Sequence, residues 1–259
     1  MTDLTLLIKT SNSRQLKQID ELLNSEFENL SVDVKVLGSP AKWVKISLSG
    51  EDEIIATSYI NKKIGTCPIS IKKIDKFSIL KGYISKVDTV NQELRVDVGV
   101  FEPKIIQAAI PLAYLRAQLV DGKKIDLQKI SEIYGFKENL PLTVKVIRLN
   151  DEAEGVLQAE LSIEQIEKIH SWRQSLLDRL IILGASLGEV ETVLERTMLN
   201  RDIIGTESLG MFEHALTCKL GTDAAGLVSK VGRYMRNAEL IVFNPKKIVE
   251  VIGESVFNL

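Results

Sequence analysis

The hydrophobic pattern of the first 77 residues switches several times between a two-residue period and a helical period. Apolar side chains alternate in segment 31–38, which is typical of a half-buried strand. In segment 14–27 they recur every three or four residues, which predicts a helix capped by Ser13. The predicted order is strand 4–10, helix 14–27, strand 31–38, strand 42–50, helix 51–65 and strand 67–74. This β-α-β-β-α-β order indicates a ferredoxin-like domain.

Residues 80–162 form a second pattern, in which five short β-type runs are interrupted by one helical segment. Segment 126–136 has apolar positions at helical spacing, whereas the other runs are short and bounded by turn residues. The predicted strands are 80–87, 93–100, 108–115, 142–151 and 155–162. Five strands with one helical interruption are typical of a small closed barrel of the oligonucleotide-binding type, the OB fold.

The rest of the chain predicts a mixture of helices and strands. A long helix over 162–184 is expected to end at Gly184, and Ser186 with Glu189 predicts a capping box for the next helix. The following elements are helix 187–199, strand 210–221, helix 223–235 capped by Thr222, strand 238–243 and helix 246–256 preceded by Pro245. The predicted fold class is α+β, with a ferredoxin-like domain at 1–77, a five-stranded OB barrel at 78–163 and a mixed α/β domain at 164–259.

Composition and charge narrow the range of partners. The 259 residues include 33 Lys and Arg against 35 Asp and Glu, so the formal net charge is −2 and any basic surface must arise from folding. Cys67 and Cys218 are far apart, and we expect both to be reduced, buried thiols. The N-terminus has no signal-peptide pattern, and no apolar run reaches the roughly 18 residues that span a bilayer. We therefore expect a cytoplasmic protein without a membrane partner.

The barrel segment resembles the S-one RNA-binding domain, which is repeated in the largest protein of the small ribosomal subunit. The matching positions follow the strand order of that family: Gly82-Tyr83-Ile84, Val96-Asp97-Val98-Gly99, Ile110-Pro111-Leu112 with Leu115, Val144, Val146 and Ile147 with Asp151, and Leu161-Ser162. The resemblance covers about a third of the chain. It implies an OB barrel that binds RNA, in which aromatic side chains stack on bases.

The whole chain resembles an uncharacterised conserved archaeal protein family with a central S-one-like domain. Segments 214–235 and 238–245 carry this resemblance best. It implies an archaeal source and a three-part architecture, and it brings no catalytic mechanism.

The densest group of lysines lies around the junction of the first two predicted domains. Asp75 is the only acid between Lys62 and Lys86, which favours contact with RNA or a ribosome. The alternative is that these lysines guard strand edges against unwanted pairing. The candidate nucleic-acid-binding residues in this group are Lys62, Lys63, Lys72, Lys73, Lys76, Lys81 and Lys86.

Further candidates lie in the barrel and near the C-terminus. Arg95 is on the second predicted barrel strand, and the aromatic residues that could stack on bases, or instead fill the core, are Tyr83, Phe101 and Tyr114. A basic stripe on the predicted helix 223–235 and just beyond it comprises Lys230, Arg233 and Arg236. Their three-residue spacing predicts one helix face, which either contacts phosphates or is an ordinary solvated surface.

We find no residue pattern that predicts a catalytic, metal-binding or cofactor-binding site. His170 and His214 are the only histidines, and we expect both to be partly buried and hydrogen-bonded. The segment GTDAAG at 221–226 lacks the Lys-Ser/Thr ending of a nucleotide-binding loop. We therefore predict a non-catalytic protein that binds RNA or a ribonucleoprotein such as the ribosome, of the archaeal translation or RNA-processing type. The alternatives are a protein–protein adaptor that keeps the OB scaffold and, less favoured, an enzyme with a site between domains.

Overall fold

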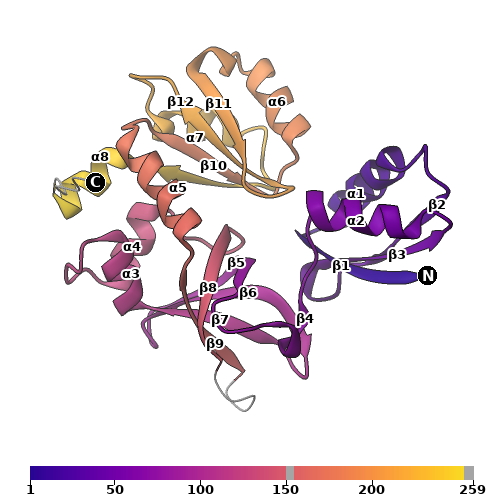
Figure 1. Ribbon diagram of the computed structural model, residues 1–259. Coiled ribbons are helices and arrows are strands. Elements are labelled where there is room, and N and C mark those ends of the chain that lie inside the picture. The colour runs from indigo at the N-terminus through magenta and orange to yellow at the C-terminus, as the bar shows by residue number, and fades with distance from the viewer. Residues whose placement is uncertain (150–154, 254–259) are drawn as a thin grey trace. The chain divides into compact units, whose positions relative to one another are not determined.

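The structure, a computed structural model, describes residues 1–149 and 155–253, and the chain divides into two units (Figure 1). The first unit comprises residues 1–74 with 98–106, and the second comprises 75–97 with the part of the chain from residue 107 onward. The predicted strand position Asp151 and the end of the last predicted helix, 254–256, lie outside the described residues.

The first unit contains a three-stranded antiparallel sheet of order β1-β3-β2 and two helices. Its elements are β1 (Thr2–Lys9), α1 (Ser13–Glu26), β2 (Val32–Gly38), β3 (Trp43–Gly50) and α2 (Glu53–Lys63). Ile19, Trp43 and Ile60 are fully buried, because both helices turn apolar positions toward the core. Asn12 caps α1 in place of the predicted Ser13, since its side chain accepts a hydrogen bond from the backbone N of Gln15.

Segment 67–74 differs from the predicted strand. Thr66 forms one antiparallel bridge with Leu6, and only β4 (Ile69–Ser70) is a strand, which pairs in parallel with β6 (Glu93–Glu102). Pro68 has no N–H with which to continue the ladder, and Ile69 has a φ of 63°, so the chain turns away from β1. The fourth strand of the predicted ferredoxin-like pattern is therefore reduced to a bridge.

The central segment forms a closed five-stranded barrel, and the predicted α+β class with such a barrel is confirmed. Its strands are β5 (Ile79–Asp88), β6, β7 (Ile106–Pro111), β8 (Pro141–Leu149) and β9 (Val156–Leu161), in the order β6-β5-β8-β9-β7 with β6 pairing β7. The third strand is shorter than predicted, because Pro111 ends it and α3 (Leu112–Leu119) begins. Helix α4 (Leu127–Tyr134) lies within the predicted helical segment.

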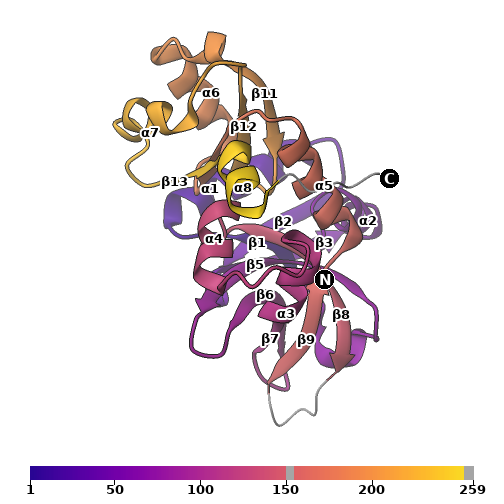
Figure 2. The ribbon, with the colours of Figure 1, turned by 90° about the vertical axis from the view of Figure 1, so that its left-hand side faces the viewer.

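The C-terminal part of the second unit is a four-stranded antiparallel sheet of order β11-β12-β10-β13. Its elements are α5 (Ile163–Gln174), β10 (Arg179–Leu183), α6 (Leu187–Arg196), β11 (Ile203–Ser208), β12 (Glu213–Cys218), α7 (Ala224–Gly232), β13 (Glu239–Phe243) and α8 (Pro245–Ile252). One face of this sheet packs against α6 and α7 in a continuous apolar core. The other face packs against α5 and the barrel end, and α4, α5 and α8 lie next to one another (Figure 2).

The predicted helix 162–184 is wrong in its second half, where β10 replaces it. All five residues of β10 are buried, because helices cover both faces of the sheet. A short, continuous apolar run has no two-residue alternation, and its period alone does not separate a strand from a helix. The edge strand β11 was not predicted. The capping box of Ser186 and Glu189 is confirmed, whereas α7 is capped by Asp223 in place of Thr222.

Candidate nucleic-acid interface

The predicted lysine group is divided between the two units. Lys62 and Lys63 lie in the last turn of α2, and Lys72 and Lys73 lie in a short 3₁₀ helix at 71–73, all exposed in the first unit. The other three members of the group, Lys76, Lys81 and Lys86, belong to the second unit. The predicted group therefore has four members in the first unit and three in the second, and of the latter Lys81 and Lys86 lie on the barrel strand β5.

Lys86 and Arg95 serve the hairpin between β5 and β6. Lys86 Nζ is 3.1 Å from Asp88 Oδ2, and Arg95 forms ion pairs with Glu93 at 2.8 Å and with Asp88 at 3.7 Å. The backbone N–H of Asn91, and then Lys86, lower the pKa of Asp88 to about 2. Both predicted RNA contacts therefore pair with acids of their own hairpin, and these acids offset part of their positive charge.

The three predicted aromatic positions on the barrel differ in how accessible they are. Tyr83 is only 1% exposed, so its ring is not accessible to a base. Tyr114, which was predicted on the third strand, lies on α3 because the strand ends at Pro111. Phe101 is partly buried in β6. Of these three, Tyr83 is excluded as a base platform by burial alone.

The predicted basic stripe near the C-terminus is not a single helix face. Lys230 lies in the last turn of α7, but Gly232 ends that helix and Arg236 lies in the following turn. Lys230, Arg233 and Arg236 are all exposed. Tyr234 is 47% exposed and lies 4.8 Å from the Arg196 guanidinium, which makes this a second basic and aromatic surface.

An exposed aromatic residue that the sequence reasoning missed lies immediately before β5. Phe77 is 55% exposed, and its ring centroid is 4.8 Å from Lys76 Nζ and 5.3 Å from Lys145 Nζ. The Phe77 backbone N donates to Val146 O at 2.8 Å, which fixes the residue beside β8. Its φ is 73°, a conformation that costs a bulky residue about 1–3 kcal/mol.

The strand register extends this surface along the barrel. Ile79 of β5 faces Lys145 of β8, and Lys145 faces Glu160 of β9, with which it forms an ion pair of 3.3 Å. Side chains directly opposite each other on paired strands point to the same face. Ile79 is 56% exposed, so an exposed apolar side chain lies opposite Lys145, whose ammonium group also approaches the Phe77 ring. We term Lys76, Phe77, Ile79 and Lys145 the Phe77 face.

Two residues beyond Ile79, Lys81 lines a cavity of about 260 Å³ in the second unit. The cavity, which we term the Lys81 pocket, is formed by β5, β8, the first turns of α5 and the end of β11. Its lining residues are Lys81, Pro141, Leu142, Thr143, Glu164, Gln165, Lys168, Ser208 and Leu209. Gln165 is held in place because its side chain accepts from Thr143 N at 3.1 Å and its backbone N donates to Ser162 Oγ.

Lys168 and Ser208 are each positioned by one partner. Lys168 Nζ is 2.6 Å from Glu207 Oε1, and the other carboxylate oxygen of Glu207 accepts from Trp172 Nε1 at 3.0 Å. Ser208 Oγ is 3.3 Å from Nδ1 of His214, which is buried as predicted. Burial lowers the pKa of His214, so this ring is neutral near pH 7. The pocket thus presents ammonium, hydroxyl and amide groups.

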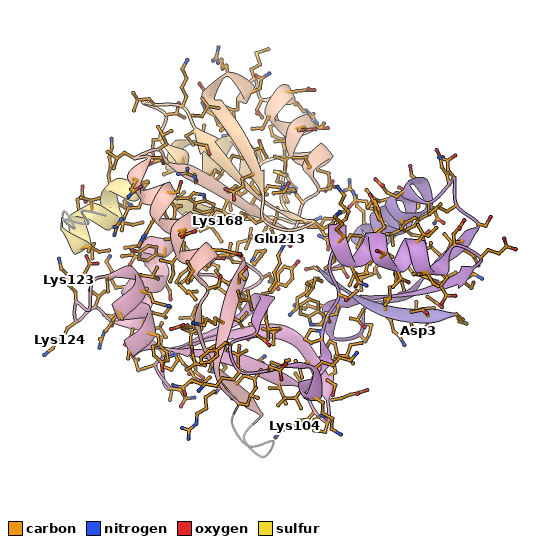
Figure 3. The ribbon with its side chains drawn as sticks, viewed as in Figure 1. Asp3, Lys104, Lys123, Lys124, Lys168 and Glu213 are labelled. Carbon is orange, nitrogen blue, oxygen red and sulfur yellow. The ribbon has the colours of Figure 1, made fainter. Side chains whose placement is uncertain are left out.

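A buried carboxyl group lies behind Lys81. Glu213, at the start of β12, is 4% exposed, and one of its oxygens accepts from Phe212 N at 3.3 Å. It also hydrogen-bonds the Tyr83 hydroxyl, which gives that buried hydroxyl group a partner. Burial raises the pKa of Glu213 to about 8, against the opposing effects of Phe212 N–H, Lys81 and Tyr83. Figure 3 shows Glu213 and Lys168 on the elements next to this part of the barrel.

Lys81 responds to the same environment. Burial lowers the pKa of Lys81 below its ordinary value, and Glu213 acts in the opposite direction. The signal for this site in the sequence was the two-residue spacing of Ile79 and Lys81, which places both side chains on one face of β5, and Phe77 precedes that strand. The contribution of Lys168 and Ser208 had no local signal, because they come from distant segments.

Three further features of the described residues concern metal-binding groups, membrane-spanning helices and free cysteines. Within 1–149 and 155–253, no group of three or more His, Cys, Asp or Glu side chains could hold a metal ion. No helix in that same part of the chain has the length and apolar character needed to cross a membrane. Cys67 and Cys218 are both buried thiols, as predicted.

Barrel, flanking sheets and surface together define an α+β protein built around a closed five-stranded barrel. Models of the DUF2110 N-terminal, central and C-terminal domains match residues 3–70, 75–173 and 177–243. The chain carries all three domains in order and belongs to the DUF2110 family.

Comparison with other proteins adds two similar structures. No curated protein matches the chain. One of the two similar structures is the crystal structure of a protein from vaccinia virus (Wisconsin strain), whose sequence is 18% identical to this chain. The match has a TM-score of 0.22 and covers 34% of this chain and 89% of the viral protein. The intact alpha subunit of aIF2 from Pyrococcus abyssi is 10% identical, with a TM-score of 0.26, over 65% of this chain and 97% of that one.

Proposed function

We propose that this protein binds single-stranded RNA, free or within a ribonucleoprotein, through the Phe77 face of its barrel. The observation that carries the proposal is the exposed Phe77 ring held between the ammonium groups of Lys76 and Lys145. Proteins that bind single strands combine aromatic platforms with cations that follow the backbone, and each stacked base contributes about 1–3 kcal/mol. Burial of Tyr83 moves the stacking role from the predicted position to Phe77.

The charge distribution supports contact with phosphates near this face. Lys76 is exposed, Lys81 lines the adjacent pocket, and Lys145 forms an ion pair with Glu160. If these three lysines each contact one phosphate, the slope of log affinity against log salt is about −2 for a single strand. Affinity should then fall about 20-fold between roughly 50 and 200 mM salt. The predicted setting, archaeal translation or RNA processing, is part of this proposal and follows from the resemblances of the barrel segment and of the whole chain.

Fluorescence polarisation with a labelled mixed-sequence RNA tests the proposal. Phe77→Leu keeps the apolar character but removes the π surface, so we expect binding weakened by roughly fivefold or more. Tyr234→Leu is the matched control, because it removes an exposed aromatic ring near Arg196 on the other basic surface. Equal affinity of Phe77→Leu and wild type, or a loss confined to Tyr234→Leu, would contradict a role for the Phe77 face.

A protein–protein adaptor is the second candidate function. The exposed Ile79 beside Phe77 favours it, because an apolar and aromatic surface suits a protein partner as well as a base. The ion pair of Lys145 with Glu160 reduces the local positive charge and points the same way. Affinity capture with and without nuclease separates the two functions. A partner that survives nuclease and is lost with Ile79→Ser supports the adaptor, whereas loss of all partners after nuclease supports RNA binding.

A further inference from the structure

The Lys81 pocket contains a cation that no acid of the described chain neutralises. Within residues 1–149 and 155–253, Lys81 forms no ion pair, although it is half-buried. A buried ammonium group without a counter-charge is unfavourable, and a bound anion would relieve that cost. The surrounding donors, the Lys168 ammonium and the hydroxyls of Thr143 and Ser208, suit an oxyanion.

The nearby acids leave this positive charge in place. Glu213 is buried and holds its proton near pH 7, since its pKa is raised to about 8. Glu207 is occupied by Lys168 and Trp172. Glu164 lines the pocket but is exposed at the first turn of α5, where it can turn to solvent. Among the described residues that line the pocket it is the one acid, and its negative charge opposes a bound anion. Removing this charge should therefore strengthen anion binding.

We propose that the Lys81 pocket binds one phosphate group, with Lys81 as its cationic ligand, Lys168, whose charge is offset by Glu207, as a further N–H donor, and Thr143, Gln165 and Ser208 as neutral donors. The cavity of about 260 Å³ accommodates a phosphate with its attached sugar and falls below the roughly 300–1,000 Å³ of pockets for larger organic ligands. The phosphate comes either from the RNA strand or from a free nucleotide or phosphate ion.

The position of the pocket favours a strand phosphate and, in this respect, the inference rests on the proposed function. Lys81 lies two residues after Ile79 on β5, about 7 Å along the strand at the usual rise, and Phe77 lies two residues before the start of this strand. Ile79 and Lys81 have their side chains on the same face of β5. A strand that stacks a base on Phe77 therefore reaches the pocket within a few nucleotides. The pocket would set the register of the strand, while Phe77 would supply stacking without sequence preference.

Three variants test the site. Lys81→Gln removes the ligand charge and should weaken RNA binding about tenfold and make the salt slope shallower by about 0.7. Glu164→Gln, at an exposed position that leaves folding intact, should strengthen binding by several-fold, because it removes the opposing charge. Lys86→Gln is the matched control on the same strand, and we expect little change because Asp88 already neutralises Lys86.

Two further arms identify the source of the phosphate. RNA with a 5′-phosphate is compared with RNA with a 5′-hydroxyl, and inorganic phosphate is titrated alone while backbone amide resonances of Thr143 and Ser208 are followed. A 5′-phosphate preference that Lys81→Gln abolishes assigns the pocket to strand ends, and equal loss for both RNAs assigns it to an internal phosphodiester.

The proposal and the proposed function fail in different ways. If RNA binds but Lys81→Gln and Glu164→Gln leave affinity and salt slope unchanged, the pocket proposal is overturned and RNA binding stands. If RNA does not bind but inorganic phosphate shifts the Thr143 and Ser208 resonances in wild type and not in Lys81→Gln, the pocket stands as a site for free phosphate. If neither ligand binds, both proposals are overturned.

Discussion

The buried carboxyl group of Glu213 predicts a specific dependence of stability on pH. Its pKa is about 8 in the folded protein against an ordinary 4.5, so between these values the unfolded chain has lost a proton that the folded protein keeps. An acid whose pKa is raised by folding loses stability as pH rises through this window. At 1.36 kcal/mol per pH unit, the loss approaches about 5 kcal/mol by pH 8.

Replacing Glu213 with Gln removes this titration while keeping the shape and one hydrogen-bond acceptor for Phe212 N. We expect the variant and wild type to have similar free energies of unfolding at pH 5. The variant should gain on wild type by about 1.4 kcal/mol per pH unit between pH 5 and pH 8, because only wild type must keep a buried acid protonated.

Urea unfolding at several pH values measures this difference. Trp172 lies in the second unit and Trp43 in the first, so a Trp43→Phe background lets tryptophan fluorescence report the unit that contains Glu213. Glu164→Gln, on the nearby helix α5, serves as an exposed carboxylate control. Parallel stability curves for Glu213→Gln and wild type from pH 5 to 8 would refute the assignment of a buried, protonated carboxyl group.

Three further substitutions test the packing. Gly99→Ala should destabilise the first unit by about 1–3 kcal/mol in urea unfolding, because Gly99 has a φ of 72° and a Cβ there would lie 2.5 Å from Cys67 Sγ. An unchanged unfolding midpoint would mean that the β4 and β6 segments do not approach each other as described. Leu180→Ala, on the fully buried strand β10, should cost about 2–5 kcal/mol, whereas Ile204→Ala on the exposed edge strand should stay within about 0.5 kcal/mol. Similar losses for Leu180→Ala and Ile204→Ala would place β10 outside the core.

Local sequence signals identified most of the secondary structure and missed elements whose identity depends on distant partners. The capping box at Ser186 and the helix at 126–136 were predicted because their signals lie within a few residues. The predicted helix at 162–184 failed at β10, because helices on both sides of the sheet bury every residue of that strand. The edge strand β11 has little hydrophobic pattern and is defined by its ladder to β12.

The candidate site was only partly predictable for the same reason. Lys76 and Lys81 were selected from local charge density, and both lie at the surface that we propose for RNA. Lys86 and Arg95 were selected by the same rule, but hairpin acids pair with them. Charge counted along a sequence does not separate a free cation from a paired one, because pairing depends on strand register.

The sequence by itself determined that residues 80–162 build a five-stranded barrel, since alternation, glycine placement and turn residues act over short distances and specify strands wherever one face is buried. Only the tertiary structure decided what that barrel presents. Folding brings β12 and α5 to β5, which buries Tyr83 against Glu213 and forms a pocket around Lys81. It leaves Phe77 exposed between Lys76 and Lys145, which are 69 positions apart in sequence. Burial and charge pairing are properties of contacts between distant segments, and no local pattern encodes them.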